Sequence, residues 1–370
     1  MGRPLDLKFI NVHRFKAIRS SGQIGLTPLT VLIGNNGSGK SSLVEAMETV
    51  RDIALKGLDE AMQRWYGFEN VWNLAHKREM DRPREMLKDP MGFSFSGRIS
   101  SGAFRVKLSV NAEDLNFDKL RIESYETSER GGAYRDSSRF VEKGRIADPR
   151  LKEMVGGWQF LRLAPGNMAD PVPRKRTGGD VELAPDGANL AEYLLEIRDA
   201  DRYAFDGIVD TLRFVLPYVE SLQPNVTSEL DRKVFLQLTE KDMQEKIQGW
   251  MLSAGTMRVL ALLAVLRHPN PPPVVIVEEL ENGLDPRTVH LIMEEIRSFV
   301  TEEGGQVIAT SHSPYLLDLL TLEHIVFVER DATGQPRFRR PADNRELEKW
   351  SAEFGPGRLY TMGRLAREDD

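Results

Sequence analysis

The sequence predicts an α/β fold with a mostly parallel core sheet, an antiparallel β lobe and an inserted helical lobe. Three observations predict it. An apolar strand at 29–33 runs into a glycine-rich loop and then a helical pattern. Short apolar strands at 274–277, 307–310 and 324–331 are separated by helical segments, which is typical of parallel strands with helices on both faces. Residues 81–127 contain runs that alternate apolar and polar side chains, which predicts antiparallel strands.

The order of these patterns predicts four segments. We expect residues 1–80 and 246–330 to form the two parts of the core, 81–245 to form the inserted β and helical lobe, and 331–370 to form a C-terminal tail. Apolar residues at helical spacing follow Lys40 up to about residue 64, and residues 189–219 and 256–267 are also helical in pattern. The polar stretches 128–150 and 171–180 are predicted to be loops, the first of them mobile.

Composition limits the class of protein. With 370 residues, 41 % of them hydrophobic, the chain is long enough for two or three lobes around a large core. No apolar run reaches the roughly 18 residues that span a bilayer, and the start lacks a signal-peptide pattern, so we expect a cytoplasmic protein without a membrane partner. The absence of cysteine excludes disulfides and thiolate zinc sites. A net charge of −6 argues against a protein coated in nucleic acid and leaves a local basic groove open.

The stretch GNNGSGKSS fits the phosphate-binding pattern G-x-x-x-x-G-K-[ST]. Its residues are Gly34, Asn35, Asn36, Gly37, Ser38, Gly39, Lys40, Ser41 and Ser42. Glycines let the backbone N–H groups point at phosphate oxygens, and the helix that follows adds its positive end. We expect Lys40 to reach the β and γ phosphates of ATP and Ser41 to bind Mg²⁺. The alternative, a turn that binds nothing, does not account for the strand before the loop and the helix after it.

A second motif, VVIVEELENGLDP, places two acids directly after an apolar strand. This is the Walker B arrangement, in which Glu278 would lie beside Mg²⁺ and Glu279 would orient or deprotonate the attacking water. Aspartate is more usual at the first position, and the longer Glu278 is expected to hold the metal through water. The alternative is a buried strand that ends in surface acids, and the glycine loop upstream argues against it.

Two shorter motifs complete the pattern. In LSAGTMR, Ser253 can cap an apolar helix, and Gly255 lets the backbone approach an anion closely. In ATSHSP, His312 follows an apolar strand, where we expect it to face the γ-phosphate as a switch histidine. A lone histidine is more often a structural residue. Its place after the Walker B strand favours function.

Together these four motifs resemble the RecF/SMC-like group of ABC-type ATPases, which have a P-loop NTPase head. They are most similar to predicted bacterial ATPases related to the OLD family, many of them associated with anti-phage defence. The sequence departs from that subgroup at Leu280 and Asp285, where proline and histidine are common. The resemblance extends over essentially the whole chain and is loose between 81 and 245. OLD relatives carry a Toprim nuclease domain after the ATPase; about forty residues follow the last predicted core strand here, so we expect any nuclease or toxin activity to come from a partner.

The resemblance implies a composite ATP site. In that group, Ser253 and Gly255 of one chain complete the site around Lys40 of a second copy, and Asp285 lies in the loop that contacts the partner. We therefore expect an isologous homodimer that forms around ATP, with hydrolysis as the switch. Larger assemblies are compatible with the same motifs.

Three alternative functions are compatible with this ATP site. The first is an ATPase that engages DNA or gates an associated effector, in anti-phage defence or DNA repair. The second is an ATPase scaffold that cages a nuclease or toxin partner without binding DNA. The third is the ATPase subunit of a membrane transporter, which the lack of a clear glutamine loop argues against. Basic clusters around Lys16, at 174–176 and at 337–340 are candidates for phosphate contacts, although such clusters are usually solvated surface.

Overall fold

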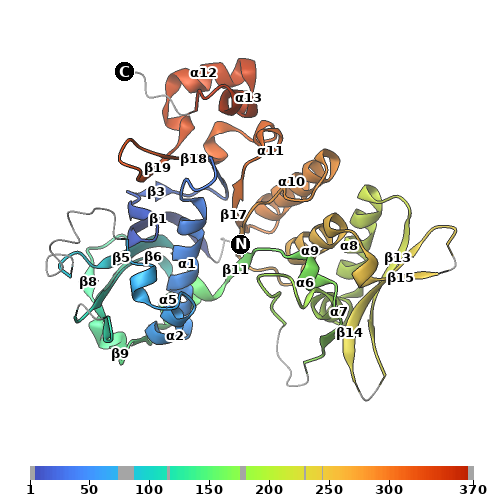
Figure 1. Cartoon of the computed structure of the whole chain (residues 1–370), viewed down its shortest axis with the longest axis horizontal. Coiled ribbons are helices and arrows are strands. Elements are labelled where there is room, and N and C mark those ends of the chain that lie inside the picture. The colour runs from blue at the N-terminus through green and yellow to red at the C-terminus, as the bar shows by residue number, and fades with distance from the viewer. Residues whose placement is uncertain are drawn as a thin grey trace. The chain divides into compact units, whose positions relative to one another are not determined.

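The computed structural model describes residues 5–73, 87–114, 117–175, 181–228, 231–243 and 245–365. The chain forms two compact units (Figure 1). Unit 1 contains Met1–Trp158 and Ile308–Asp370, and unit 2 contains Gln159–Val307.

An antiparallel sheet in unit 1 has the strand order β2-β1-β5-β6-β7-β8, with β3 paired to β1. The strands are β1 (Asp6–Phe15), β2 (Ile18–Ser20), β3 (Ile24–Gly25), β5 (Met91–Ile99), β6 (Gly102–Ala112), β7 (Leu120–Glu129) and β8 (Arg135–Asp136). Val12, Phe93 and Leu108 are aligned across three neighbouring strands, and all three are buried. The alternating pattern therefore predicted the antiparallel strands correctly, and β1 joins them in one sheet.

Three helices accompany this sheet in unit 1: α1 (Lys40–Leu55), α2 (Leu58–Gln63) and α5 (Pro149–Gly156). The helix predicted after Lys40 is divided at Gly57, which has a φ of 106° that other residues rarely adopt. Leu43, Met47 and Val50 of α1 are buried, as their spacing predicted, and α1 packs against α2 and α5.

The prediction of a mobile loop at 128–150 is wrong. This stretch contains β8, β9 (Val141–Glu142), β10 (Arg145–Ile146) and the start of α5. Ser137 and Asp148 are buried within it. Few aliphatic side chains are present, and the segment is fixed by hydrogen bonds between polar side chains, a kind of order that hydrophobic periodicity does not detect.

The second sheet of unit 1 carries the glycine loop. Its strand order is β17-β4-β18-β19, and β4 and β18 run parallel. The strands are β17 (Gln306–Ser311, in unit 1 from Ile308), β4 (Leu29–Ile33), β18 (Ile325–Arg330) and β19 (Pro336–Arg339). Beyond β17 the unit contains α11 (Pro314–Asp318), α12 (Arg345–Phe354) and α13 (Pro356–Thr361). The apolar strands predicted at 29–33, 307–310 and 324–331 are confirmed.

Unit 2 contains the neighbouring strands β11 and β16 and a four-stranded sheet in which β14 pairs with β12, β13 and β15. The strands are β11 (Trp158–Leu161), β12 (Val172–Pro173), β13 (Val219–Val226), β14 (Lys233–Glu240), β15 (Lys246–Gln248) and β16 (Val274–Val277). The helices are α6 (Pro165–Met168), α7 (Leu190–Ala200), α8 (Arg202–Val215), α9 (Ala254–Leu266) and α10 (Pro286–Thr301). Helix α9 is buried on every face from Thr256 onward, as its apolar run predicted. The predicted loop at 171–180 lies partly outside the described residues.

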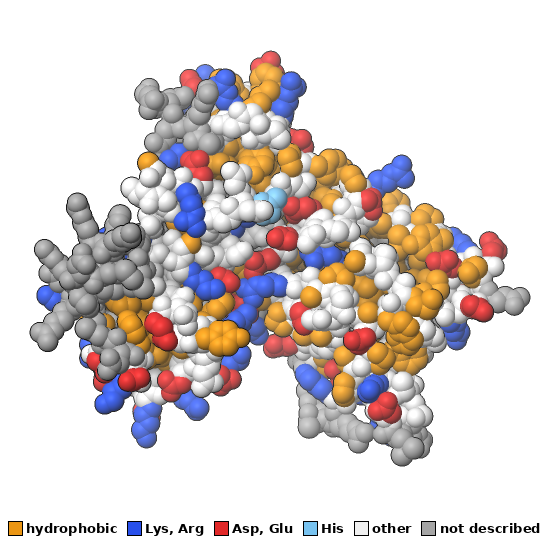
Figure 2. Space-filling model, viewed as in Figure 1, with side chains coloured by type: hydrophobic (Ala, Val, Ile, Leu, Met, Phe, Trp, Pro, Cys, Tyr) orange, Lys and Arg blue, Asp and Glu red, His pale blue; other side chains and the backbone are white. Residues whose placement is uncertain are grey.

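Unit 2 also exposes large hydrophobic side chains. They are Tyr203, Phe214, Tyr218, Val226, Met243, Trp250 and Met251. Figure 2 shows hydrophobic side chains gathered on the surface of the part of unit 2 that holds α8, β13 and β15. Among the described residues, none of the helices combines the length and apolar character needed to cross a membrane.

Candidate functional site

The glycine loop lies between the fully buried strand β4 and the start of α1, as predicted. Gly39 precedes the helix with a φ of 113°, and a Cβ atom at this position would lie 2.7 Å from Pro336 Cγ. A Cβ atom at Gly34 would lie 1.9 Å from the carbonyl oxygen of Val328. The close approach of β18 and β19 therefore requires glycine at both ends of the loop.

The start of α1 is open to an anion. Gly39 supplies no side-chain cap, and the first turn contains no acidic residue. The partial positive charge of the first N–H groups of the helix is therefore not compensated by a side chain. The hydroxyl of Ser38 is buried and has no hydrogen-bond partner in the described part of the chain. Ser41 is exposed in the first turn. Unused donors of this kind fit phosphate oxygens.

Lys40 is buried and bonded to the loop itself. Its Nζ atom donates to the carbonyl oxygens of Gly34 at 2.7 Å and Asn35 at 3.0 Å. A carbonyl oxygen is a weaker partner for an ammonium group than a phosphate oxygen. The side chain can therefore exchange these bonds for phosphate without leaving the loop.

Residues from the C-terminal part of unit 1 also contact the loop. Arg330 Nε donates to the carbonyl oxygen of Gly37 at 2.7 Å, and the Tyr360 hydroxyl lies 3.4 Å from Asn35 Oδ1. Sequence reasoning missed both residues, because neither lies in a motif and both are about 300 positions away from the loop along the chain.

His312 is half-buried directly after β17, the strand next to β4. Its backbone is fixed on both sides. The Ser313 N–H donates to Ser311 Oγ at 3.0 Å, and Ser313 Oγ caps α11 by accepting from the N–H of Leu316. The predicted switch histidine thus follows the strand that the sequence indicated, within the same unit as Lys40.

The two predicted acids follow β16 in unit 2. Glu278 forms an ion pair with Arg162, and its N–H donates to the carbonyl oxygen of Leu161 at 2.9 Å. Glu279 has an exposed carboxylate, which accepts a hydrogen bond of 3.0 Å from Asn282. Its φ is 50°, a conformation that glutamate rarely adopts and that is more frequent at functional sites.

The signature segment packs directly against the loop that follows these acids. Ser253 Oγ caps α9 by accepting from the Thr256 N–H at 3.1 Å, while the residue itself stays exposed. A Cβ atom at Gly255 would lie 2.8 Å from the carbonyl oxygen of Gly283. The predicted glycine is therefore needed for this close approach, whether or not an anion binds there.

Arg258 connects α9 to the acidic loop. Its guanidinium donates to the carbonyl oxygens of Leu163 and Glu279, each at 2.8 Å. Burial lowers the pKa of Arg258, and the charges of Glu279 and Glu281 act in the opposite direction. Sequence reasoning did not single out this arginine, although a charged residue in an otherwise apolar helix was a visible signal.

Asp285 has a structural role that the sequence did not predict. It caps α10 by accepting from the N–H groups of Arg287 at 3.0 Å and Thr288 at 3.2 Å. The hydrogen bond from the Thr288 hydroxyl lowers the pKa of Asp285, and the backbone bonds add to this effect. The residue is exposed, so a contact with a second chain stays a prediction.

The predicted site residues thus form two groups. Unit 1 holds the glycine loop with Lys40 and Ser41, and His312. Unit 2 holds the signature segment, the two acids and Asp285. For Mg²⁺, the Ser41 hydroxyl and the Glu278 carboxylate are oxygen donors of the kind the ion prefers when it also binds phosphate. Within the described residues, no group of three or more acidic or histidine side chains could hold a metal ion.

The basic clusters are largely engaged within the fold. Lys16 Nζ lies 2.8 Å from Glu45 and 3.6 Å from the centre of the Trp65 ring. In the cluster at 337–340, Arg337 pairs with Asp331, Arg339 pairs with Glu329, and Arg340 donates to backbone carbonyl groups. The cluster at 174–176 lies partly outside the described residues. These contacts favour the interpretation of structural surface charge at Lys16 and at 337–340.

The chain is similar to known proteins in sequence and in fold. Residues 29–145 and 162–318, most of the chain, match a family described as "AAA domain, putative AbiEii toxin, Type IV TA system". A solved structure of an SmcHead bound to the C-winged helix domain of ScpA is similar with a TM-score of 0.60 and 13 % identity, covering 90 % of this chain and 96 % of that one. No curated protein sequence matches the chain.

A second solved structure agrees. It is an Smc head domain with an extended coiled coil, bound to the C-terminal domain of ScpA derived from Pyrococcus furiosus. Its TM-score is 0.57 with 13 % identity, and the match covers 90 % of this chain and 95 % of that one. At this identity the likeness shows the fold. The prediction of an ABC-type head of the SMC kind, with P-loop NTPase architecture, is therefore confirmed.

Proposed function

Because the chain belongs to the AAA domain family matched above, we propose that it binds ATP with Mg²⁺ and hydrolyses it to ADP and phosphate. The observation that carries the proposal is the glycine loop. It combines an uncapped helix start with a buried Ser38 hydroxyl that has no partner among the described residues. Its Lys40 ammonium group is hydrogen-bonded to a carbonyl oxygen of the loop itself. Each of these features fits a polyphosphate.

In this mechanism Lys40 turns from the loop carbonyl groups to the β and γ phosphates. Mg²⁺, held by Ser41 and Glu278, would neutralise phosphate charge when bound. Glu279 orients or deprotonates the attacking water, and His312 contacts the γ-phosphate. The exposed carboxylate and positive φ of Glu279 support a role at the reacting centre.

We further propose that two copies of the chain form the complete site. Ser253 and Gly255 of one copy would close over the ATP bound by the other, and Asp285 would contact the partner. Ser253 is exposed, and so are Trp250 and Met251 just before it, with 52 % and 68 % of their surface accessible. Large exposed apolar side chains beside a motif are typical of an interface, and this supports an ATP-dependent homodimer.

The downstream role we propose is to engage DNA or to gate an associated effector in anti-phage defence or DNA repair. The family description names a putative toxin of a type IV toxin–antitoxin system, which supports an effector such as a toxin or nuclease. A scaffold that cages such an effector without binding DNA is the second candidate, and the family description is compatible with both. Salt-dependent DNA binding stimulated by ATP would select the first role.

Phosphate release from ATP tests the enzymatic proposal. We expect the wild type to hydrolyse ATP, Lys40→Ala to lose nucleotide binding, and Glu279→Gln to bind ATP while its turnover falls about 100-fold or more. Glu294→Gln, on the exposed side of α10, is the matched control and should keep full turnover. Equal turnover in Glu279→Gln and the wild type would contradict the assigned role.

A further inference from the structure

A polar cavity lies in unit 1 where β7 meets the segment that follows it. It has a volume of about 440 Å³ and is lined by residues between Thr127 and Arg150. This is the stretch that the sequence predicted to be a mobile loop. All the lining residues belong to unit 1, and none of them belongs to the glycine loop or the other nucleotide motifs.

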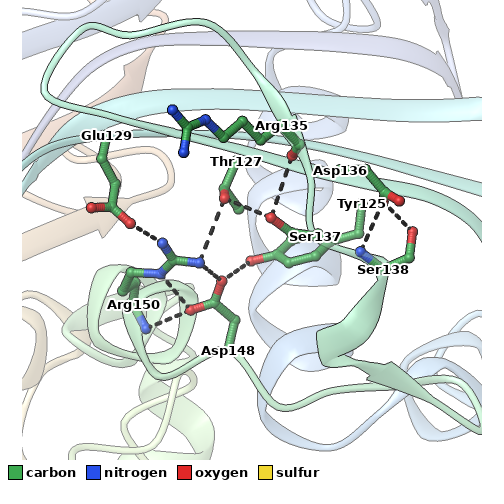
Figure 3. Close-up of polar contacts among 9 residues, drawn as sticks. All are labelled: Tyr125, Thr127, Glu129, Arg135, Asp136, Ser137, Ser138, Asp148 and Arg150. Atoms are coloured by element: carbon green, nitrogen blue, oxygen red, sulfur yellow. Dashed lines mark hydrogen bonds and ion pairs between the residues drawn. The ribbon is translucent and has the colours of Figure 1, made fainter.

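The wall of the cavity is held by a buried ion pair. Arg150 donates to Asp148 through Nε at 2.9 Å and Nη2 at 2.6 Å, and it also pairs with Glu129 (Figure 3). The buried Tyr125 hydroxyl donates to Asp148 at 3.0 Å. Burial alone would raise the pKa of Asp148, but the hydrogen bonds from Arg150 and Tyr125 outweigh it and lower the pKa. This network links β7 to the start of α5 and favours the ionised form of Asp148.

Two hydroxyl groups and a second guanidinium lie beside this wall. Thr127 Oγ1 lies 2.8 Å from Ser137 Oγ and 3.5 Å from Arg150 Nη2. In Figure 3 the guanidinium of Arg135 lies on the opposite side of Thr127 from that of Arg150. The Arg150 guanidinium is engaged by Asp148 and Glu129, and the two hydroxyls bond to each other, so the Arg135 guanidinium is the donor group that remains available beside them.

The cavity lining holds one more cation than anion, because Arg135, Arg139 and Arg150 face the carboxylates of Glu129 and Asp136. Of its acidic residues, Glu129 is paired with Arg150, and Asp136 accepts from the backbone and hydroxyl of Ser138. In the part of the chain that the structure describes, neither Arg135 nor Arg139 has an ion pair or a hydrogen bond to its guanidinium group. The contact of the Arg139 guanidinium is with the Phe140 ring, at 4.9 Å. Two arginine guanidinium groups therefore remain available at the exposed rim, with the carboxylate of Asp136 beside them.

We propose that this cavity binds the phosphate group of a ligand of about mononucleotide size. Arginine guanidinium groups match the oxygens of phosphate in geometry and charge, and hydroxyl donors complete such sites. The volume lies within the range of small-ligand pockets, and it exceeds the needs of a free phosphate ion. The site is separate from the proposed ATP site and does not depend on it.

Titration calorimetry on the full chain with inorganic phosphate and with AMP tests the proposal. The Lys40→Ala background weakens any response of the glycine loop. We expect Arg135→Gln or Arg139→Gln to weaken binding about tenfold or more, since each removes a charged hydrogen-bond donor. Both side chains are exposed and lack polar partners among the described residues, so neither change should disturb folding. Arg121→Gln, an exposed arginine at the other end of β7, is the matched control and should bind as the background chain does.

Oligonucleotides distinguish the source of the phosphate group. If a strand with a 5′-phosphate binds, its 5′-hydroxyl form does not, and Arg135→Gln removes the difference, the phosphate belongs to a nucleic-acid end. Binding of AMP alone assigns it to a free phosphorylated compound, and either result supports the site. The proposal is overturned if none of these probes binds, or if Arg135→Gln and Arg139→Gln bind as tightly as Arg121→Gln.

Discussion

Glu279 shows how neighbouring residues fix a single side chain in the candidate site. Its backbone has a positive φ and accepts a hydrogen bond from Arg258 at the carbonyl oxygen, while Asn282 donates to its carboxylate. A strained backbone persists only where the surroundings over-determine it. We therefore infer that the carboxylate is oriented before substrate binds, as water activation requires.

Asn282→Ala tests this orientation. We expect turnover to fall roughly tenfold while ATP affinity stays unchanged, because Asn282 contacts the carboxylate and lies outside the phosphate loop. Steady-state hydrolysis and equilibrium nucleotide binding measure the two effects. Asn270→Ala, an exposed asparagine in the loop before β16, is the control. Unchanged turnover in Asn282→Ala would show that the hydrogen bond has no role in catalysis.

The contribution of Asp148 to the stability of the fold depends on pH, because its pKa is lowered in the folded chain. The carboxyl group is ionised and bonded in the folded chain, whereas in the unfolded chain it titrates near its ordinary value of 3.8. A depressed folded pKa contributes stability above the unfolded value, and this contribution is lost as the pH falls through the folded pKa.

We expect Asp148→Asn to lower the free energy of unfolding by about 1–3 kcal/mol near neutral pH, since Arg150 and Tyr125 lose a charged acceptor. The difference from the wild type should narrow as the pH falls below about 4. Urea unfolding across this pH range measures it. A difference that stays constant or grows on acidification would contradict the assigned direction.

At the scale of elements, α9 and the loop before α10 form one closely packed assembly. Gly255 and Gly283 bring the two backbones together, and Arg258 bonds to the acidic loop from the buried face of α9. Because the two backbones lie close together and Arg258 links them, the signature segment and the catalytic acid are expected to move as a unit within unit 2.

Gly255→Ala is expected to destabilise this assembly. The new Cβ atom would lie 2.8 Å from a backbone oxygen that cannot move alone, so we expect a loss of about 1–3 kcal/mol in the free energy of unfolding. Gly166→Ala, where a Cβ atom would meet nothing within 4 Å, is the matched control. If urea unfolding gives the same free energy of unfolding for both variants, the two backbones can move apart without loss of stability, and the prediction is wrong.

At the scale of the whole molecule, continuous apolar runs predicted the elements that are buried on every face, such as β4, β16 and α9. The motifs also predicted where Lys40 and the two acids lie on those elements. Sequence reasoning missed Arg162 and Arg330, because their contacts join positions that are far apart along the chain. Its prediction of a mobile loop at 128–150 is wrong, because the polar side chains that fix this segment do not recur at a regular spacing along the sequence.

The proposed mechanism places two ATP molecules between two copies of the chain, because at each site the glycine loop and the signature segment come from different copies. This is the central claim of the account. It requires that the γ-phosphate hold the copies together, so a variant that binds ATP without hydrolysing it should accumulate as a dimer.

The mass of the chain in solution with ATP and Mg²⁺ tests this claim most directly. We expect Glu279→Gln to form a dimer that requires ATP, Lys40→Ala to remain a monomer, and the wild type to dimerise only transiently. A mass that does not respond to nucleotide in any of the three proteins would contradict the composite site.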